Sequence, residues 1–312
     1  MANRIISIVG PTALGKTKIA IMLAKKIKGE IVSCDSMQVY RHMNVGTAKP
    51  SKEEMGNIPH FMIDIVDPNK NYSVALFAKQ AKICIENIIS RKKVPLLVGG
   101  AGLYFDAITK DIDFVECEAD LKYREKLFKL AKTRGNNFVY SILENIDFCS
   151  FKNLHPNNLK RVVRALEFYH LTGKTITQQK SAQKTLIYDS LTFGLSVSRE
   201  KLYLAIENRV DEMFRRGFVE EVKELLNMGV NKFNTSIQAI GYKEIMNYLE
   251  DGEDEKRLAE TIMLIKQKSK NYAKRQLTWF RKNNDIRWIT LQNCYDVKKV
   301  AEDIFLQIKN LF

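Results

Sequence analysis

The sequence predicts an α/β fold: a parallel sheet with helices on both faces, together with an all-helical insertion domain. In the first hundred residues, short apolar runs alternate with amphipathic helical patterns, as is typical of a parallel sheet covered on both sides. The first run leads into a glycine-rich loop, GPTALGKT, which marks a core of the P-loop type. Between residues 113 and 190 strand-like runs almost disappear, which indicates the helical insertion.

Strands are expected where Ile, Val and Leu cluster in short runs. These runs are RIISIVG at 4–10, EIVSCD at 30–35, HFMIDIVDP at 60–68 and VPLLVGG at 94–100. Helical patterns separate them at 16–27 and 73–93. The first of these helices carries a single apolar stripe that we expect to pack on the sheet, formed by Ile19, Ala20, Leu23, Ala24 and Ile27.

The insertion is predicted as several helices, at 120–135, 137–146 and 158–173, where Pro156 in LHPNN supplies a break. A further strand, LTFGLSV, follows at 191–197, and long helices continue to about residue 282. We therefore expect residues 1–112 and 191–312 to form the α/β core and residues 113–190 to form the insertion domain.

Length and composition exclude several classes of protein. The chain has 312 residues, enough for a substantial core, and no run approaches the roughly 18 apolar residues of a membrane span. Its start lacks the pattern of a signal peptide, so we expect a cytoplasmic protein. The five cysteines are scattered without a Cys-x-x-Cys pair, which favours ordinary thiols over disulfides or a zinc site: Cys34, Cys84, Cys117, Cys149 and Cys294.

The charge indicates a polyanionic partner. Lys and Arg outnumber Asp and Glu by 50 to 36, a formal net charge of +14. Basic residues concentrate at 152–184 and at 265–282, and the second stretch also contains three aromatic residues. Cations interleaved with flat rings are typical of a nucleic-acid surface, but the same spacing fits a solvated helix face whose aromatics are core. The stretch alone does not separate these two readings.

The loop at residues 10–17 predicts a phosphate site. It fits G-x-x-x-x-G-K-[ST] between a strand and a helix, where backbone N–H groups cradle phosphate oxygens. Lys16 would reach the terminal phosphate, and the Thr17 hydroxyl is placed for Mg²⁺. The loop by itself does not specify which molecule carries the phosphates.

A nucleotide hydrolase would also need a strand-end Asp that holds Mg²⁺. Asp64 and Asp67 are available, but a turn before Pro68 explains them equally well, and they stay unassigned. Asp35 ends the strand at 30–35. Because the carboxyl ends of parallel strands meet at one crevice, we expect Asp35 to face the ligand of the loop.

Six segments in order, spanning almost the whole chain, resemble the tRNA dimethylallyltransferase (tRNA isopentenyltransferase) family: GPTALGKT, DSMQVYRHMNVGTAKP, VGGAGLY, HPNNLKRVVRALEFYHLTGK, AIGYKE and YAKRQLTWFR. The resemblance implies transfer of a dimethylallyl group from dimethylallyl diphosphate to the exocyclic N6 amine of the adenosine 3′-adjacent to the anticodon (position 37) of tRNA. It also implies Mg²⁺ as cofactor and the tRNA anticodon stem-loop as partner. We expect a monomer.

The resemblance also implies roles for individual residues. Catalysis would involve Asp35, Lys16 and Thr17, with Thr17 at the metal. Diphosphate would be bound by Gly10, Pro11, Thr12, Ala13, Leu14, Gly15, Lys16, Thr17 and Arg209. The target adenine would lie against Asp35, Ser36, Met37, Gln38 and Ala101, with Gln38 reading the base edge. Further tRNA contacts would come from Arg124, Lys160, Arg161, Val162, Val163, Arg164, Lys274, Arg275 and Gln276.

The chain departs from the family pattern at two points. Ala101 stands where the family usually has Thr, and Ser269-Lys270 replaces a common Thr-Arg pair. Three alternatives to tRNA prenylation remain open on the sequence: a small-molecule kinase suggested by the phosphate loop, an RNA-binding module with a vestigial loop, and a related enzyme that prenylates free adenine nucleotides. The insertion and the basic C-terminal helix argue against the kinase and the nucleotide enzyme.

Overall fold

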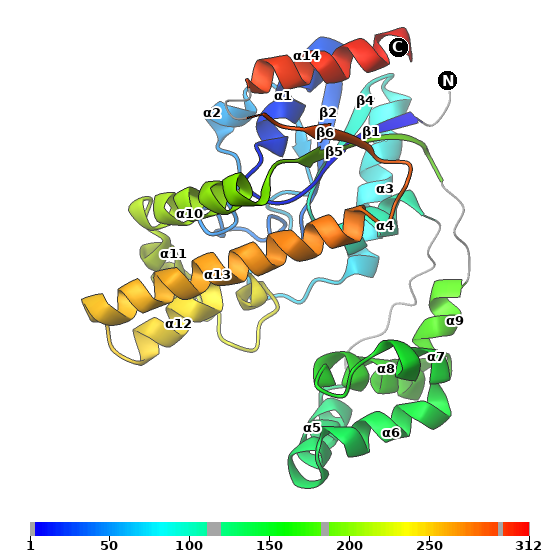
Figure 1. Ribbon diagram of the computed structural model, residues 1–312, viewed down its shortest axis with the longest axis vertical. Coiled ribbons are helices and arrows are strands. Elements are labelled where there is room, and N and C mark those ends of the chain that lie inside the picture. Colours follow the sequence, from blue (N-terminus) through cyan, green and yellow to red (C-terminus); the bar gives the residue numbers. More distant parts are fainter. Residues whose placement is uncertain (1–3, 111–119, 182–186, 293–295, 312) are drawn as a thin grey trace. The chain divides into compact units, whose positions relative to one another are not determined.

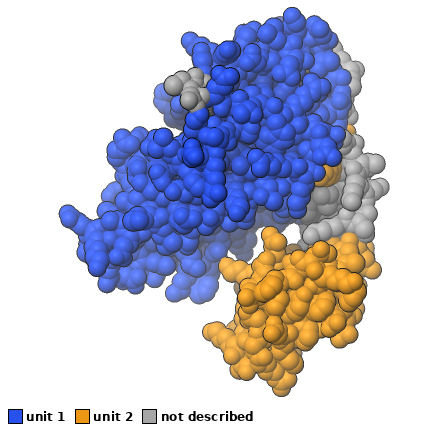
Figure 2. All heavy atoms as spheres, viewed as in Figure 1, with its two compact units in different colours: residues 1–109, 188–312 blue, residues 110–187 orange. Residues whose placement is uncertain are grey.

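The computed structural model describes residues 4–110, 120–181, 187–292 and 296–311. The chain divides into two compact units, drawn in different colours in Figure 2: unit 1 is Met1–Thr109 with Tyr188–Phe312, and unit 2 is Lys110–Ile187. The sequence predicts that the insertion spans residues 113–190, and residue 113 lies outside the described residues.

Of the five cysteines, Cys34, Cys84 and Cys149 are free thiols, and Cys117 and Cys294 lie outside the described residues.

Unit 1 is built on a six-stranded sheet in the order β3-β2-β4-β1-β5-β6, in which every strand pair is parallel. The strands are β1 (Arg4–Val9), β2 (Gly29–Cys34), β3 (His60–Phe61), β4 (Val94–Gly99), β5 (Asp189–Ser196) and β6 (Arg287–Thr290). In the centre, Ile6 of β1 lies between Leu96 of β4 and Leu191 of β5. The loops that follow β1, β2 and β4 therefore leave the sheet at the same edge.

Helices cover both faces of this sheet (Figure 1). On one face α1 (Lys16–Ile27) and α14 (Val297–Ile308) share a core with β1, β4 and β5, and the predicted stripe of α1 is fully buried there. On the other side α3 (Val74–Ser90) packs on β2 and β4 and contacts α4 (Gly102–Thr109). These features confirm the predicted α/β fold class with a P-loop-type core.

A second group of helices in unit 1 follows β5. It consists of α10 (Arg199–Arg215), α11 (Phe218–Asn227), α12 (Tyr242–Glu250) and the 26-residue α13 (Glu255–Phe280). The long helix α13 packs against α10, α12 and α4. Because α13 reaches from α12 to the end of β4, it can bring C-terminal residues to the edge of the sheet where the loops meet (Figure 1).

Two strands differ from the sequence prediction. The strand expected at 60–68 is only two residues long, because Met62 and Asp64 have φ values of 64° and 54°, in the left-handed region, and the chain turns away from the sheet. The short strand β6 was not predicted, since its four residues RWIT are too few for a clear alternation. Its pairing with β5 adds the last strand of the sheet.

Unit 2 is helical in its described part, with α5 (Leu121–Arg134), α6 (Asn136–Ile146), α7 (Phe148–Asn153), α8 (Leu159–Thr172) and α9 (Ile176–Ser181). Its core is formed mainly by one face each of α5, α6 and α8, including Leu127, Leu143 and Leu166. The unit therefore has a small hydrophobic core of its own. Among the helices that the structure describes in either unit, none is long and apolar enough to cross a membrane.

Candidate active site

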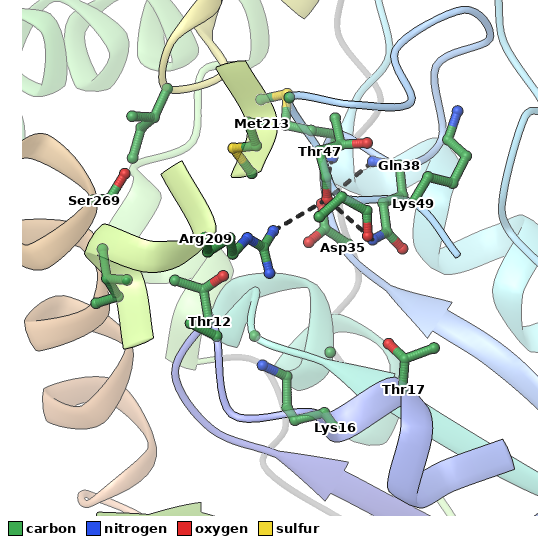
Figure 3. Close-up of a pocket in the computed structure, with 18 of the residues that line it drawn as sticks. Thr12, Lys16, Thr17, Asp35, Gln38, Thr47, Lys49, Arg209, Met213 and Ser269 are labelled. Atoms are coloured by element: carbon green, nitrogen blue, oxygen red, sulfur yellow. Dashed lines mark hydrogen bonds between the residues drawn. The ribbon is translucent and has the colours of Figure 1, made fainter. Parts of the chain in front are cut away.

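A cavity of about 620 Å³ opens at the carboxyl edge of the sheet, entirely within unit 1. The loops after β1, β2 and β4 form one side of it, and side chains from α10 and α13 form the other. Figure 3 shows Lys16 and Thr17 at the start of α1, with Asp35 and Gln38 across the cavity and Arg209 between them. The cavity is within the size range of small-molecule sites.

The loop after β1 has the backbone of a phosphate cradle. Ala13 and Gly15 are left-handed, with φ values of 67° and 69°, and α1 begins with no side-chain cap on its free N–H groups. Gly10 has φ 138°, and a Cβ there would lie 2.8 Å from the carbonyl oxygen of Leu195. The loop thus has the backbone that the predicted anion site requires, and no side chain in the described part of the protein caps the N-terminus of α1.

Two cations face this cradle. The Lys16 ammonium donates to the carbonyl of Pro11 at 2.7 Å. Burial, and then the charge of nearby Arg209, lower the pKa of Lys16 from 10.5 to about 7, although Asp35 opposes the shift. Burial also lowers the pKa of Arg209, again against the attraction of Asp35. A multiply charged anion bound between the two cations would relieve this repulsion.

Asp35 follows directly on β2 and is held by the backbone of its own turn. Its Oδ1 accepts hydrogen bonds from the N–H of Met37 at 2.8 Å and of Gln38 at 3.3 Å. Oδ2 receives no hydrogen bond from any residue in the described part of the chain. The carboxylate is thus fixed in orientation while keeping an oxygen for a ligand.

A loop at residues 44–48, which we call the 44–48 loop, closes the cavity beside Asp35. The carbonyl of Thr47 accepts from the Arg209 guanidinium at 3.3 Å and from the Gln38 amide at 3.3 Å. The Gln38 carbonyl oxygen accepts from the Ser33 hydroxyl at 3.0 Å. Gln38 lines the cavity as predicted, yet its amide is engaged by the protein in this structure, so reading a base would require it to exchange these bonds.

Glu221 of α11, which the sequence reasoning did not single out, anchors the 44–48 loop. Its carboxylate accepts the N–H groups of Asn44 and Val45, each at 2.7 Å, and of Gly46 at 3.0 Å. The Tyr242 hydroxyl adds a fourth hydrogen bond at 2.7 Å. Glu221 shares the apolar face of α11, and a carboxylate on such a face was the signal that could have revealed it.

Asp64 and Asp67, left unassigned on the sequence, are both in ion pairs. Asp64 contacts the buried Lys49 ammonium at 2.5 Å, and Lys49 also donates to the Tyr40 carbonyl at 2.8 Å. Asp67 pairs with Arg41 at 2.7 Å. Neither carboxylate lines the cavity, and each links the segment after β3 to a cation in the segment between β2 and β3.

Several basic side chains of helix α13 form ion pairs within the protein, so the helix has fewer free cations than its sequence indicates. Lys266, Lys268 and Lys270 form ion pairs with acids on α10 and α12, at 2.6, 2.6 and 2.5 Å. Arg275 is exposed at the rim of the cavity and Lys274 is exposed outside it. These two therefore remain the α13 cations for which a tRNA contact is proposed.

Gln276, predicted to contact tRNA, is only 6% exposed, and its side-chain amide bonds the protein backbone. Its Oε1 accepts from the N–H of Thr12 at 3.0 Å, and its Nε2 donates to the carbonyl of Gly100 at 2.9 Å. Each end of the amide therefore has one partner inside the protein, and the small exposed part of the side chain lines the cavity. The tRNA contact expected of Gln276 stays a prediction, restricted to the part of the side chain that faces the cavity.

In unit 2, the predicted tRNA-binding residues fall into three groups. Val162 and Val163 are 0% and 1% exposed in the core, so their side chains cannot touch RNA and that part of the prediction is corrected. Arg124 and Arg164 both bond the buried carboxylate of Glu167. Lys160 and Arg161 are exposed cations, so their predicted role in tRNA binding stays a prediction.

The remaining predicted site residues divide by their place around the cavity. Thr12, Ser36, Met37 and the other residues already placed at the cavity line its wall, as does Ser269, one of the departures from the family pattern. Five others do not line it: Gly10, Pro11, Leu14, Ala101 and Lys274. Ala101 lies just beyond the wall, where its N–H donates to the Cys34 carbonyl at 3.3 Å.

Comparisons with known proteins agree with this architecture. The family model for IPP transferase matches residues 38–283. A tRNA dimethylallyltransferase of Caldanaerobacter subterraneus subsp. tengcongensis is 45% identical over 309 residues, which cover 98% of this chain and 97% of that relative. The solved tRNA isopentenylpyrophosphate transferase of Bacillus halodurans superposes with a TM-score of 0.73 at 41% identity, covering 99% of this chain and 96% of the other.

A eukaryotic dimethylallyltransferase, solved while acting on tRNA, superposes with a TM-score of 0.80 at 29% identity, covering 98% of this chain and 78% of the other. The match to a family model over most of the chain, together with a relative of high identity along nearly its full length, identifies the family. This chain belongs to the IPP transferase family.

Proposed function

We propose that this protein transfers the dimethylallyl group of dimethylallyl diphosphate to N6 of the adenosine at position 37 of tRNA, next to the anticodon. The observation that carries the proposal is the union of two half-sites in one cavity. A phosphate cradle with Lys16 and Arg209 faces the carboxylate of Asp35, which keeps Oδ2 free. Prenyl transfer requires such a pairing of an anion site for the leaving group with a proton acceptor for the amine.

On the donor side, the residues act on the bond between the prenyl carbon and the diphosphate oxygen. As this bond breaks, negative charge accumulates on the diphosphate, and the loop amides, Lys16 and Arg209 stabilise that charge. The low pKa of Lys16 in the free protein means that a bound diphosphate would also draw a proton onto this side chain. Diphosphate binding and charge neutralisation are therefore coupled at Lys16.

On the acceptor side, the amine nitrogen forms a bond to the prenyl carbon and must lose a proton. Asp35 Oδ2 would take this proton, while Oδ1 stays fixed by its two backbone N–H partners. The products are prenylated tRNA, free diphosphate and one proton. Because the amine would be out of reach inside a stacked loop, the base must leave the stack to enter the cavity.

The cavity also fits the predicted Mg²⁺. Mg²⁺ usually takes few protein ligands, because it keeps water and binds substrate phosphates. Within the described residues no group of three His, Cys, Asp or Glu could hold a metal, and the Thr17 hydroxyl lies at the cradle. We propose that Thr17 is the protein ligand; when bound, the ion would neutralise charge on the leaving diphosphate.

For tRNA we propose contacts from the exposed cations of both units. Lys160 and Arg161 of unit 2 and Lys274 and Arg275 of unit 1 are exposed, and each would neutralise backbone phosphate. Arg124 and Arg164 retain partial exposure beside Glu167, so they can contribute to the same electrostatic surface. A cytoplasmic location and a monomeric state remain predictions.

The test is transfer of label from dimethylallyl diphosphate to unmodified tRNA, with ATP as an alternative substrate for the kinase hypothesis. We expect incorporation that depends on an adenosine at position 37. Asp35→Asn should lose at least 100-fold in kcat while retaining tRNA affinity, as a lost general base predicts. Asp67→Asn is the matched control, since that carboxylate lies outside the cavity. Absence of transfer to any tRNA by the unmodified protein would refute the proposal.

A further inference from the structure

Gln276 joins three segments that are distant in the sequence. It lies near the end of α13, and its side-chain amide bonds the N–H of Thr12 in the phosphate loop and the carbonyl of Gly100 after β4. Thr12 and Gly100 are 264 and 176 residues away from it along the chain. One buried amide therefore ties the donor side of the cavity to the end of β4.

The packing around this amide is close on both sides. A Cβ at Gly100 would lie 2.1 Å from Nε2 of Gln276 and 3.0 Å from the carbonyl oxygen of Gly10, so only glycine admits the contact. One turn further along α13, Trp279 fills the space over Gly102 and donates to Asp106 at 3.2 Å. The end of α13 is thus seated rigidly on the β4–α4 junction.

We propose that Gln276 is a positioning residue for prenyl transfer, which fixes the phosphate loop at a set distance from the end of β4. Its amide is bonded at both ends to the backbone of the cavity wall, and this role acts through those two partners. It holds the Thr12 amide in the cradle wall and holds Gly100 beside the adenine end, so that the two half-sites keep their separation. Transfer between two bound reactants is sensitive to displacements of about 1 Å, which can cost roughly 100-fold. This inference rests on the function proposed above.

The test replaces the amide without emptying its space. Gln276→Met keeps the volume and removes both hydrogen bonds, and Gln276→Glu keeps the acceptor for Thr12 but sets an oxygen against the Gly100 carbonyl. We expect kcat to fall 10- to 100-fold in both, with the KM for dimethylallyl diphosphate raised severalfold and the Kd for tRNA within twofold of the unmodified protein. Thr278→Ala, an exposed position on the same helix, is the control and should change none of these.

A second perturbation reaches the same contact from the other side. Gly100→Ala would push Nε2 away from its carbonyl, and we expect a similar loss of kcat. Because both changes break one contact, the double variant with Gln276→Met should be less impaired than the product of the two losses. This second route applies even where one of the Gln276 variants folds poorly.

The possible results distinguish a failure of the positioning role from a failure of the proposed function. If the unmodified protein transfers label and Gln276→Met matches it in kcat and KM, the positioning role is refuted while the function stands. A tenfold or greater weakening of tRNA binding with unchanged kcat would instead assign Gln276 to tRNA recognition and overturn the inference. Strictly multiplicative losses in the double variant would also overturn it, since the two residues would then act independently. Absence of transfer by the unmodified protein refutes the proposed function itself.

Discussion

The anchoring of the 44–48 loop by Glu221 yields a sharp prediction. Glu221→Gln keeps the size of the side chain but replaces one carboxylate oxygen with an NH₂ group. With Oε1 retained, Gly46 and Tyr242 keep their acceptor, whereas Asn44 and Val45 lose the oxygen that each now contacts at 2.7 Å. These two N–H groups, in a part-buried environment, would then face another donor.

The magnitude follows from these two contacts. A hydrogen bond to a charged group contributes about 1.5–3 kcal/mol, and the loop can recover part of this by shifting toward water, so we expect a net loss of about 3 kcal/mol in local stability. Through the Thr47 carbonyl the loop orients Arg209. If the shift is transmitted to the transition state, about 3 kcal/mol corresponds to a roughly 100-fold fall in kcat/KM.

The assay is steady-state prenyl transfer, with hydrogen exchange of the 44–48 amides as the structural readout. Glu224→Gln is the matched control, because it makes the same chemical change on the exposed face of the same helix. Tyr242→Phe removes only one of the four hydrogen bonds to this carboxylate and should cost less, about 1.5 kcal/mol. A Glu221→Gln protein with kcat/KM within twofold of the unmodified protein, and with unchanged amide protection, would refute the reasoning.

Three further predictions concern charge and the departure from the family pattern. Glu167→Gln should destabilise unit 2 by about 2 kcal/mol in urea unfolding, because the buried carboxylate accepts from Arg124 and the main chain, and the partly exposed arginines limit the loss. Burial alone would raise the pKa of Glu167, but the hydrogen bonds from the two arginines lower this pKa overall. The stability that the Glu167 carboxylate contributes is therefore present above pH 5 and is lost as the pH falls through the lowered pKa. An acid titration of unfolding tests this. Lys16, with a pKa of about 7, is mostly neutral at pH 8 in the free protein, so calorimetry in two buffers should show about one proton taken up when diphosphate binds. The Lys16→Arg variant should take up less. Equal proton uptake by the variant and the unmodified protein would contradict this prediction. Ala101→Thr restores the hydroxyl usual in the family just outside the cavity wall, and we expect at most a severalfold rise in kcat; a large loss would show that the neighbouring Cys34 leaves no room for it.

The phosphate cradle could be predicted because its geometry is local. The glycines of GPTALGKT specify a backbone turn, and the helix that follows supplies the amides, so residues 10–17 need no distant partner to form the site. Asp35 could be placed for a related reason, since a polar residue at the end of a parallel strand must lie at the edge where ligands bind. Both inferences depend on order along the chain alone.

The partners of individual polar groups could not be predicted in this way. In the sequence Gln276 is one more polar residue on a basic helix, but in the folded protein its amide accepts a hydrogen bond from the phosphate loop. Arg124 and Arg164 read as RNA-binding cations, yet both converge on one buried acid, Glu167. Each of these contacts links separate elements, so the sequence gives the residue type without the partner.

By itself, the sequence determined the fold class, the phosphate loop, the position of Asp35 and the family, because periodicity and ordered motifs encode local backbone and the succession of elements. Only the tertiary structure decided which polar groups are free for a ligand and which are engaged within the protein. Glu221 and Gln276 became visible at that level, since a buried hydrogen bond depends on where packing brings a donor and an acceptor together. That physical difference separates the parts of this site that residue order reveals from the parts that packing sets.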